Sequence, residues 1–176
     1  MSHYPTIAEV SASLASGKTT SRKLADAALA AIDDPAGQGA KAFIRRNDTR
    51  ARAMADASDL LRGAGQARSP LEGIAISVKD LFDLAGEVTT AGSIAMRGSA
   101  PATIDAPVVQ ALTRAGAVIT GTTNMSEFAF SGLGLNPHYG TPLNTFDRAT
   151  GRIPGGSSSG AAVSVTDGMA AVSYTH

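Results

Sequence analysis

Apolar positions along the chain follow two different spacings, and each spacing predicts a type of element. Up to residue 63, apolar side chains recur every three or four positions, which is the spacing of helices that bury one face. Residues 74–78 and 117–120 instead form short continuous apolar runs, which are typical of strands buried on both faces. The pattern therefore predicts a helical beginning followed by an α/β region.

Start and stop signals divide the beginning of the chain into three helices. A residue that can cap a helix precedes or opens each periodic segment: Thr6, Ser21 and Asp48. A residue that ends helices closes each segment: Gly17, Pro35 and Gly63. Thr6 is followed by Glu9 at the spacing of a capping box. Between the second and third helices, residues 42–44 predict a brief strand.

In the α/β region a helix and a strand are joined by one glycine. Asp105 opens a helix that Gly116 closes, and the strand at 117–120 follows at once. Together with the earlier strand at 74–78, this order predicts two parallel strands joined by a helical crossover. Three further segments complete the expected order: a short helix at 124–130, a long loop at 131–156 and a buried helix at 160–165.

Composition excludes several kinds of chemistry. The 176 residues contain no cysteine, so thiol nucleophiles, disulfide scaffolds, zinc-finger ligand sets and iron–sulfur sites are excluded. Fifteen Lys and Arg balance fifteen Asp and Glu, so bulk charge points to neither nucleic acid nor an anionic membrane. No apolar run approaches the roughly 20 residues that span a bilayer, and the N-terminus has no signal-peptide pattern. We therefore expect a cytoplasmic protein.

The densest chemical signal is PGGSSSG at residues 154–160, where a helix is expected to begin. A phosphate-binding loop is one interpretation, although the Walker pattern has a lysine where this segment has serine. A flexible linker is a second, although an apolar helix follows at once. The segment also fits G-x-S-x-G, the nucleophile elbow of α/β hydrolases, but the one histidine after it is His176.

Histidine is too scarce to supply an obvious general base. His3 and His176 are terminal, and His138 stands alone in a loop. Lysine can serve instead where burial lowers its pKa enough to leave a neutral amine near pH 7. Lys79 directly follows an apolar strand that could remove it from water. The alternative is a lysine that reaches from the end of the strand to solvent.

Two other groups carry weaker signals. His138 and Tyr139 could touch a substrate, but a single histidine in a loop is more often a surface group. Asp80 and Asp83 lie three positions apart beside Lys79, without enough further ligands for a metal site. We therefore expect neither a metal nor a cofactor.

Four segments, in the right order, resemble the amidase signature family of serine hydrolases. They are GIAISVKD at 73–80, TTAGS at 89–93, GTTNMSEF at 121–128 and PGGSSSG at 154–160. The resemblance implies an α/β fold with a central mixed β-sheet flanked by helices, truncated relative to the family. We expect an N-terminal helical region over 1–69 and the N-terminal part of the amidase signature core over 70–171.

The family cleaves a carboxamide C–N bond through an acyl-enzyme, using a Ser–cis-Ser–Lys triad. The resemblance assigns the lysine to Lys79 and the bridging serine to Ser157, which follows a cis peptide bond from Gly156. Ser158 and Met125 are expected beside these residues as supporting or substrate-binding groups, as is Gly156 itself. The implied partner is a small-molecule amide.

The resemblance departs from the family at the C-terminal end. The family's nucleophilic serine belongs to an Asp-x-Gly-Gly-Ser block and corresponds to position 181, whereas the sequence ends at residue 176. Residues 172–176 also differ from the family pattern, and we expect them to be non-native. The chain is accordingly expected to be an N-terminal fragment that is inactive alone.

Two other functions remain open. The glutaminase component of glutamyl-tRNA(Gln) amidotransferase, its A subunit, belongs to the same family, although SGLGLNPHYG at 131–140 looks more like the stand-alone amidases. A non-catalytic remnant could instead bind an anion with its Gly/Ser loop. We further expect a homodimer, with no direct contact to nucleic acid or membrane.

Overall fold

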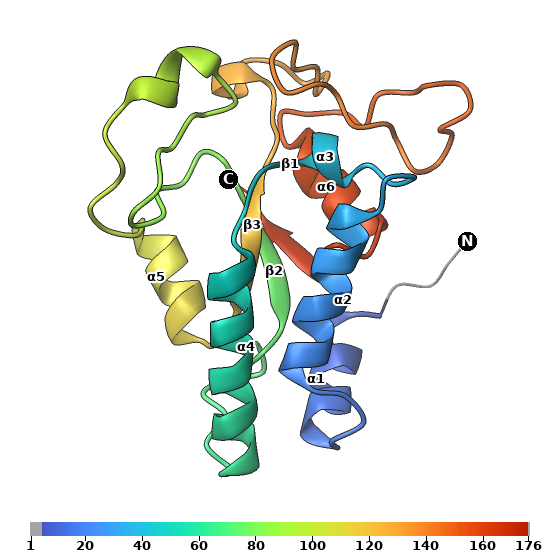
Figure 1. Cartoon of the computed structure of the whole chain (residues 1–176). Coiled ribbons are helices and arrows are strands. Elements are labelled where there is room, and N and C mark those ends of the chain that lie inside the picture. Colours follow the sequence, from blue (N-terminus) through green and yellow to red (C-terminus); the bar gives the residue numbers. More distant parts are fainter. Residues whose placement is uncertain (1–4, 176) are drawn as a thin grey trace.

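A four-stranded mixed sheet lies at the centre of the computed structural model, which describes residues 5–175 (Figure 1). Its strands are β1 (Phe43–Arg46), β2 (Ala75–Lys79), β3 (Val118–Thr123) and β4 (Val172–Tyr174), in the spatial order β1-β3-β2-β4. β2 is parallel to both β3 and β4, whereas β1 runs antiparallel to β3. The expected α/β fold with a mixed sheet is confirmed.

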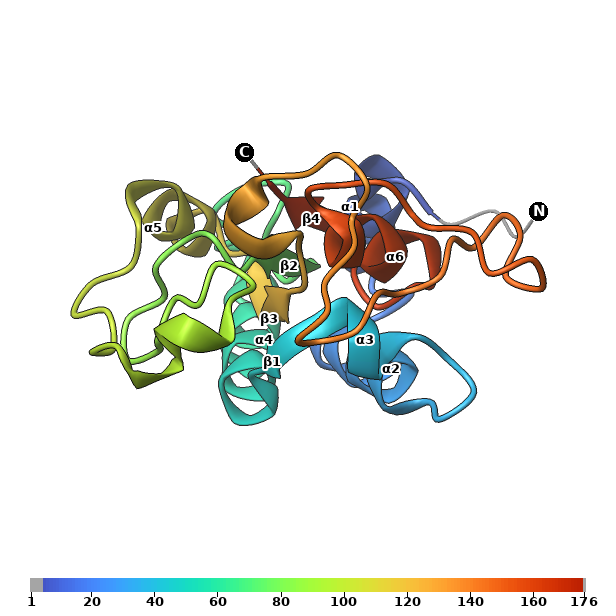
Figure 2. The ribbon, with the colours of Figure 1, turned by 90° about the horizontal axis from the view of Figure 1, so that it is seen from above.

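Helices cover both sides of this sheet. They are α1 (Ile7–Ala15), α2 (Ser21–Asp33), α3 (Gly39–Ala42), α4 (Asp48–Gly63), α5 (Pro107–Arg114) and α6 (Ser159–Thr166), with short 3-10 helices η1 (Ile94–Gly98) and η2 (Glu127–Ala129). Seen from above, α5 lies on one side of the sheet and α2 and α6 lie on the other (Figure 2). Between residues 5 and 175, no helix is long and apolar enough to cross a membrane.

Apolar side chains join the layers in three clusters. β2 packs with α1 and α5 through Ile76, Val78, Val10, Leu14 and Val109. In a second cluster, α2 and α6 meet at Leu29, Ile32 and Val163. α2 and α4 approach closely through small residues, Ala25, Ala51 and Ala55. Each buried Val, Leu or Ile side chain contributes about 1.5–3 kcal/mol relative to exposure, so these clusters fix the positions of the strands.

The first two helices differ in how well local signals predict their caps. Thr6 and Glu9 form the expected capping box at the start of α1. At α2, however, the cap is Thr20, whose side chain accepts a hydrogen bond from a backbone N–H of the first turn. Ser21, the expected cap, is instead buried, and its hydroxyl donates to a backbone carbonyl at 2.8 Å. The prediction of the cap was wrong because this serine bonds across the fold.

Two expected caps formed by aspartate are also displaced by one position. Asn47 occupies the N-cap position of α4, and Asp48 is the first helical residue, with its carboxylate paired to Arg46 at 2.6 Å. At α5 the N-cap position is held by Ala106, because the carboxylate of Asp105 accepts a backbone N–H from the loop that follows β2. A local ion pair thus holds the carboxylate of Asp48, whereas a partner 20 positions away holds that of Asp105.

The segment that follows β3 is less helical than expected. Instead of a helix over 124–130, only the short η2 forms, and Phe128 and Ala129 have φ values of +51° and +58°. The backbone N–H of Ser126 donates to the carbonyl of Ser157 at 2.9 Å. Bonds to neighbouring loops thus replace the helical pattern.

The segment for which we expected a non-native sequence takes part in the sheet. Val172–Tyr174 forms β4, which pairs with β2, and the Tyr174 ring packs edge-on against Phe82 with 5.2 Å between centroids. The non-native origin of residues 172–176 stays a prediction. His3 and His176 lie outside the described residues.

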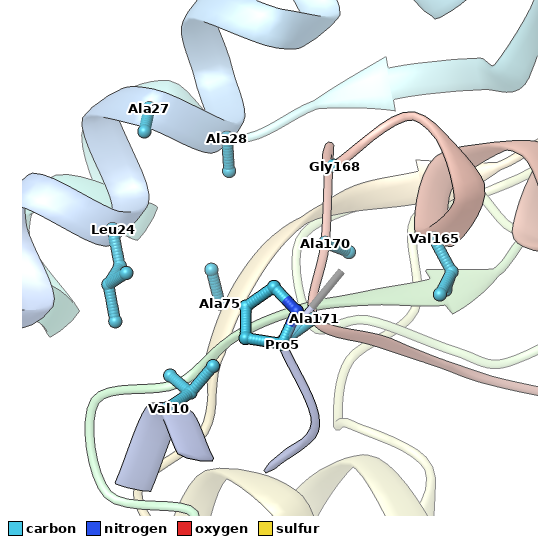
Figure 3. A pocket seen from close by; sticks show the side chains of 10 residues that line it. All are labelled: Pro5, Val10, Leu24, Ala27, Ala28, Ala75, Val165, Gly168, Ala170 and Ala171. Carbon is cyan, nitrogen blue, oxygen red and sulfur yellow. The ribbon is translucent and has the colours of Figure 1, made fainter. Parts of the chain in front are cut away.

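An apolar pocket of about 240 Å³ opens between α1, α2 and the segment that leads into β4 (Figure 3). Leu24, Val10 and Ala75 are among its lining residues. Ala75 begins β2 and Lys79 ends it, so four residue steps, about 13 Å of strand, separate the two. The pocket is therefore separate from the Lys79 region.

Candidate active site

The alternation of β2 directs Lys79 towards α6. Ser77, two residues earlier, places its hydroxyl oxygen 2.9 Å from that of Ser164 on α6. Side chains two positions apart on a strand point to the same face, so Lys79 is turned the same way. Val78, the residue between them, packs in the apolar cluster with α5. Lys79 thereby faces the start of α6, where Ser157 lies.

Lys79 and Ser157 are brought together by this arrangement. Lys79 Nζ donates a hydrogen bond to Ser157 Oγ at 2.7 Å. The lysine is 0% exposed, which differs from the alternative of a side chain that reaches solvent. Removal from water penalises the ammonium form and lowers the pKa of Lys79 from 10.5 to about 8. About half of the lysine side chains are therefore neutral at pH 8.

Backbone contacts fix Ser157. The Gly156–Ser157 peptide bond is cis, the geometry that the family resemblance implies before the bridging serine. The carbonyl of Ser157 accepts the backbone N–H of Ser126 at 2.9 Å. A Cβ atom on Gly156 would lie 2.4 Å from the backbone nitrogen of Gly134, so the long loop at 131–156 packs directly on this segment. That close approach requires glycine.

The rest of the Gly/Ser segment forms the start of α6. Ser158 occupies the N-cap position, and it lines a hollow of about 330 Å³ between α6 and β4. A Cβ atom on Gly160 would lie 2.1 Å from the carbonyl oxygen of Ala42, so the helix approaches its neighbour closely. The segment is folded against the sheet, which argues against a flexible linker.

The groups with weaker signals have partners of their own. His138 Nε2 lies 3.3 Å from Glu127 Oε1, and Arg97 donates to the hydroxyl of Tyr139 at 3.1 Å. The carboxylate of Asp83 accepts a hydrogen bond from a threonine hydroxyl. Among residues 5–175, no group of three or more His, Cys, Asp or Glu side chains could hold a metal ion.

The carboxylate next to Lys79, considered above only as a weak metal ligand, has a structural role that the sequence does not indicate. Asp80 is 0% exposed, and it accepts hydrogen bonds from the Thr90 hydroxyl, from the Gly92 N–H at 3.2 Å and from Arg45 at 2.9 Å. Burial raises the pKa of Asp80, and these hydrogen bonds oppose that rise. Arg45 comes from the distant strand β1, so no local pattern announces the pair.

A buried amide in the long loop was missed as well. Asn136 is 2% exposed, and its Nδ2 donates to the carbonyls of Gly92 at 2.8 Å and Met125 at 2.7 Å. Its Oδ1 accepts the backbone N–H groups of His138 and of the next residue. Met125 is itself 0% exposed, so its side chain is packed in the interior beneath the loops that Asn136 connects. In this loop the sequence pattern draws attention to His138, whereas the buried amide that bonds the neighbouring loops belongs to Asn136.

Known proteins share this arrangement of sequence and fold. A family model described as Amidase matches residues 26–175. The chain is 44% identical over 165 residues to AtzE, a component of the 1-carboxybiuret hydrolase of Pseudomonas sp. (strain ADP), and the match covers 94% of this chain and 35% of that protein. It is 40% identical over 167 residues to the A subunit of glutamyl-tRNA(Gln) amidotransferase from Chloroflexus aggregans, covering 95% of this chain and 33% of that one.

Solved structures agree with these similarities. The native peptide amidase from Stenotrophomonas maltophilia superposes with a TM-score of 0.82 at 36% identity, over 96% of this chain and 35% of that one. A protein of a vestigial complex, described with the origins of an s-triazine catabolic enzyme, gives a TM-score of 0.88 at 43% identity, over 94% and 36% of the two chains. The chain thus spans about a third of the length of its relatives. This protein belongs to the amidase signature family.

Proposed function

We propose that this chain supplies the lysine and the bridging serine of an enzyme that hydrolyses a carboxamide C–N bond. The observation that carries the proposal is the contact of 2.7 Å between Nζ of the buried Lys79 and Ser157 Oγ. A lysine with a pKa of about 8 can accept a proton near neutral pH and return it later. The assignment of both residues also follows the family resemblance.

In the proposed reaction, protons move along the pair in both directions. Neutral Lys79 accepts the hydroxyl proton of Ser157 while Ser157 accepts the proton of the nucleophilic serine, which attacks the amide carbon. The C–N bond then breaks, and the same proton returns through Ser157 to the leaving amine. Water then takes the place of the amine and attacks the acyl carbon, while Ser157 and Lys79 take up one of its protons. This proton returns through Ser157 to the oxygen of the nucleophilic serine as the ester C–O bond breaks, and the carboxylic acid leaves. The resemblance assigns the nucleophile to position 181.

Three neighbouring residues are given supporting roles in this proposal. Gly156 lets the long loop pack against the segment that carries Ser157. Met125 fills the space beneath the loops that surround the site, and Ser158 faces the hollow between α6 and β4. We expect Ser158 to contact the groups that complete the site, since it is the polar residue next to Ser157.

A second candidate is the glutaminase component of an amidotransferase. Several relatives 40–42% identical to this chain are the A subunits of glutamyl-tRNA(Gln) amidotransferases. The relay chemistry would be the same, with glutamine as the amide and ammonia as the product passed on. Dependence of glutaminase activity on a second type of chain would favour this candidate, whereas activity of a single chain on other amides would favour a stand-alone amidase.

A chimeric enzyme would test the roles of the two residues. This chain would replace the matching third of AtzE, to which it is 44% identical. The chimera is expected to hydrolyse the AtzE substrate. Lys79→Ala and Ser157→Ala should each lower kcat/KM about 10²- to 10⁴-fold, the range of general acid–base catalysis. The matched control Asp34→Asn alters an exposed carboxylate at the end of α2 and should retain activity. Equal activity in all variants would contradict the proposal.

The chain by itself should not form an acyl-enzyme. Incubation with a fluorophosphonate, followed by mass spectrometry of the intact chain, is expected to show no stoichiometric labelling of a serine. Stoichiometric labelling would overturn this expectation. An anion-dependent rise in melting temperature that survives Lys79→Ala would instead support a non-catalytic binding function.

A further inference from the structure

Two buried polar side chains hold one glycine of the loop beside Lys79. Gly92 donates its N–H to Asp80 Oδ2 at 3.2 Å, and its carbonyl accepts a hydrogen bond from Asn136 Nδ2 at 2.8 Å. Both partners are almost completely buried, at 0% and 2% exposed. We call Asp80, Gly92 and Asn136 the Gly92 clamp.

The geometry at Gly92 leaves no alternative residue. Its φ is +71°, a conformation in which glycine has no steric cost. A Cβ atom there would lie 2.9 Å from the Met125 carbonyl oxygen and 3.0 Å from Asn136 Nδ2. The loop is therefore held at one position from two sides, by groups that come from separate parts of the chain.

Asp80 and Asn136 of the Gly92 clamp are each connected, by covalent or hydrogen bonds, to the segment that carries one residue of the proposed relay. Asp80 is the covalent neighbour of Lys79, and its backbone N–H donates to the β3 residue Thr123 at 3.1 Å. On the other side, Asn136 bonds the Met125 carbonyl at 2.7 Å. The next residue along, Ser126, bonds the Ser157 carbonyl. The clamp thus connects the supports of both partners of the 2.7 Å contact.

The charged groups around Asp80 are themselves paired. Arg45 on β1 lies 2.9 Å from Asp80 and 3.3 Å from Glu87. Strand β4, which pairs with β2 on its other side, places the ring of Tyr174 against Phe82. Lys79 faces α6, whereas the Asp80 carboxylate bonds groups of β1 and of the 89–93 loop. The printed partners of the Asp80 carboxylate thus lie on β1 and in the 89–93 loop, and the two residues share the backbone at the end of β2.

We propose that Asp80 is a positioning residue: through the Gly92 clamp it holds the end of β2 so that Lys79 stays buried against Ser157. This inference rests on the proposed relay and extends it to a carboxylate and an amide that neither touch the reacting atoms nor belong to the triad. When Asp80 no longer holds the loop, water reaches the lysine, and the ammonium form is favoured again.

NMR titration of lysine side chains can test this on the chain itself. The sequence has four lysines, so a sample labelled at lysine Cε or Nζ gives few signals, and Lys79→Met identifies one of them. In Asp80→Asn, the titration midpoint of Lys79 is expected to rise by about one pH unit or more towards 10.5. Asp34→Asn makes the same change on an exposed carboxylate at the end of α2, outside the 89–93 loop and its partners, and should leave the midpoint unchanged.

The outcomes separate this inference from the proposed function. A wild-type midpoint near 10.5 would contradict the relay itself. A wild-type midpoint near 8 that is unchanged in Asp80→Asn would overturn the positioning role alone, and a lower midpoint would overturn it in favour of a direct effect of charge. If Asp80→Asn does not fold, Thr90→Val removes one donor to the same carboxylate, and its midpoint is expected to rise as well; no rise would again overturn the inference.

Discussion

Replacing Lys79 with methionine is expected to stabilise the fold at neutral pH. The pKa of this lysine is about 8 in the folded chain and 10.5 in water, so the unfolded chain binds the proton more tightly. A difference of about 2.5 in pKa corresponds to about 3 kcal/mol of stability, which is missing from the folded state below pH 8. Methionine keeps a similar length and removes this penalty.

The net gain is smaller than that figure. Lys79→Met also removes the hydrogen bond to Ser157, which contributes about 1 kcal/mol. The free energy of unfolding at pH 7 should therefore increase by about 1–2 kcal/mol. Because the wild-type lysine loses its proton as the pH rises from 8 to 10.5, the wild type gains stability over that range. The lost hydrogen bond then remains as the main difference, so Lys79→Met should become less stable than the wild type by up to about 1 kcal/mol.

Urea denaturation followed by far-UV circular dichroism at pH 7, 9 and 10.5 measures this difference. Lys18→Met is the matched control, since Lys18 is exposed and its replacement should change stability little at any of these pH values. The reasoning would be refuted if Lys79→Met were less stable than the wild type at pH 7, or if the difference did not vary with pH.

Two further predictions concern the opposite end of the sheet. Burial alone would raise the pKa of Glu72, but hydrogen bonds from Arg68 and Ser58 lower it to about 2, so Glu72→Gln should cost about 2–3 kcal/mol at pH 7. That loss of stability should shrink as the pH falls from 4.5 towards 2, because Glu72 of the wild type then becomes protonated and loses its charge, as in the glutamine variant. A loss that stays constant with pH in urea denaturation would contradict the assignment of the stability to the charged carboxylate. Gly116→Ala should destabilise by more than about 2 kcal/mol, because φ is +95° and the new Cβ would lie 2.8 Å from the Cα atom of Glu72. Gly63→Ala, at a helix end with open space, should instead stabilise by about 0.5–1 kcal/mol, and similar melting temperatures for the two variants would contradict this.

Hydrophobic periodicity was sufficient for most of the fold. The strands that became β2 and β3, and helices α1, α2, α4, α5 and α6, were all expected at nearly their observed positions. Local caps were less predictable, since Ser21 and Asp105 have tertiary partners that no neighbouring residue announces. The short helix α3 has four residues, too few for any period to show.

The candidate site likewise contains residues that the local sequence predicts and residues that it does not. Lys79 and Ser157 were found because each lies in a distinctive local segment, an apolar strand ending in lysine and a Gly/Ser run before a helix. Asp80 and Asn136 act through partners 35 and 44 positions away, so their importance depends on tertiary structure. Both lie inside quoted segments, GIAISVKD and SGLGLNPHYG, but residue type alone does not show which side chain of a segment holds a distant loop.

The pKa of Lys79 is the measurement that tests the central claim most directly. Lysine side-chain NMR on the wild-type chain, with Lys79→Met for assignment, would follow its four lysines from pH 6 to pH 12. The account predicts that the Lys79 signal titrates near pH 8, and that Ser157→Ala alters its chemical shift because the two side chains are hydrogen-bonded. A Lys79 signal that titrates near 10.5 and is indifferent to Ser157→Ala would contradict it.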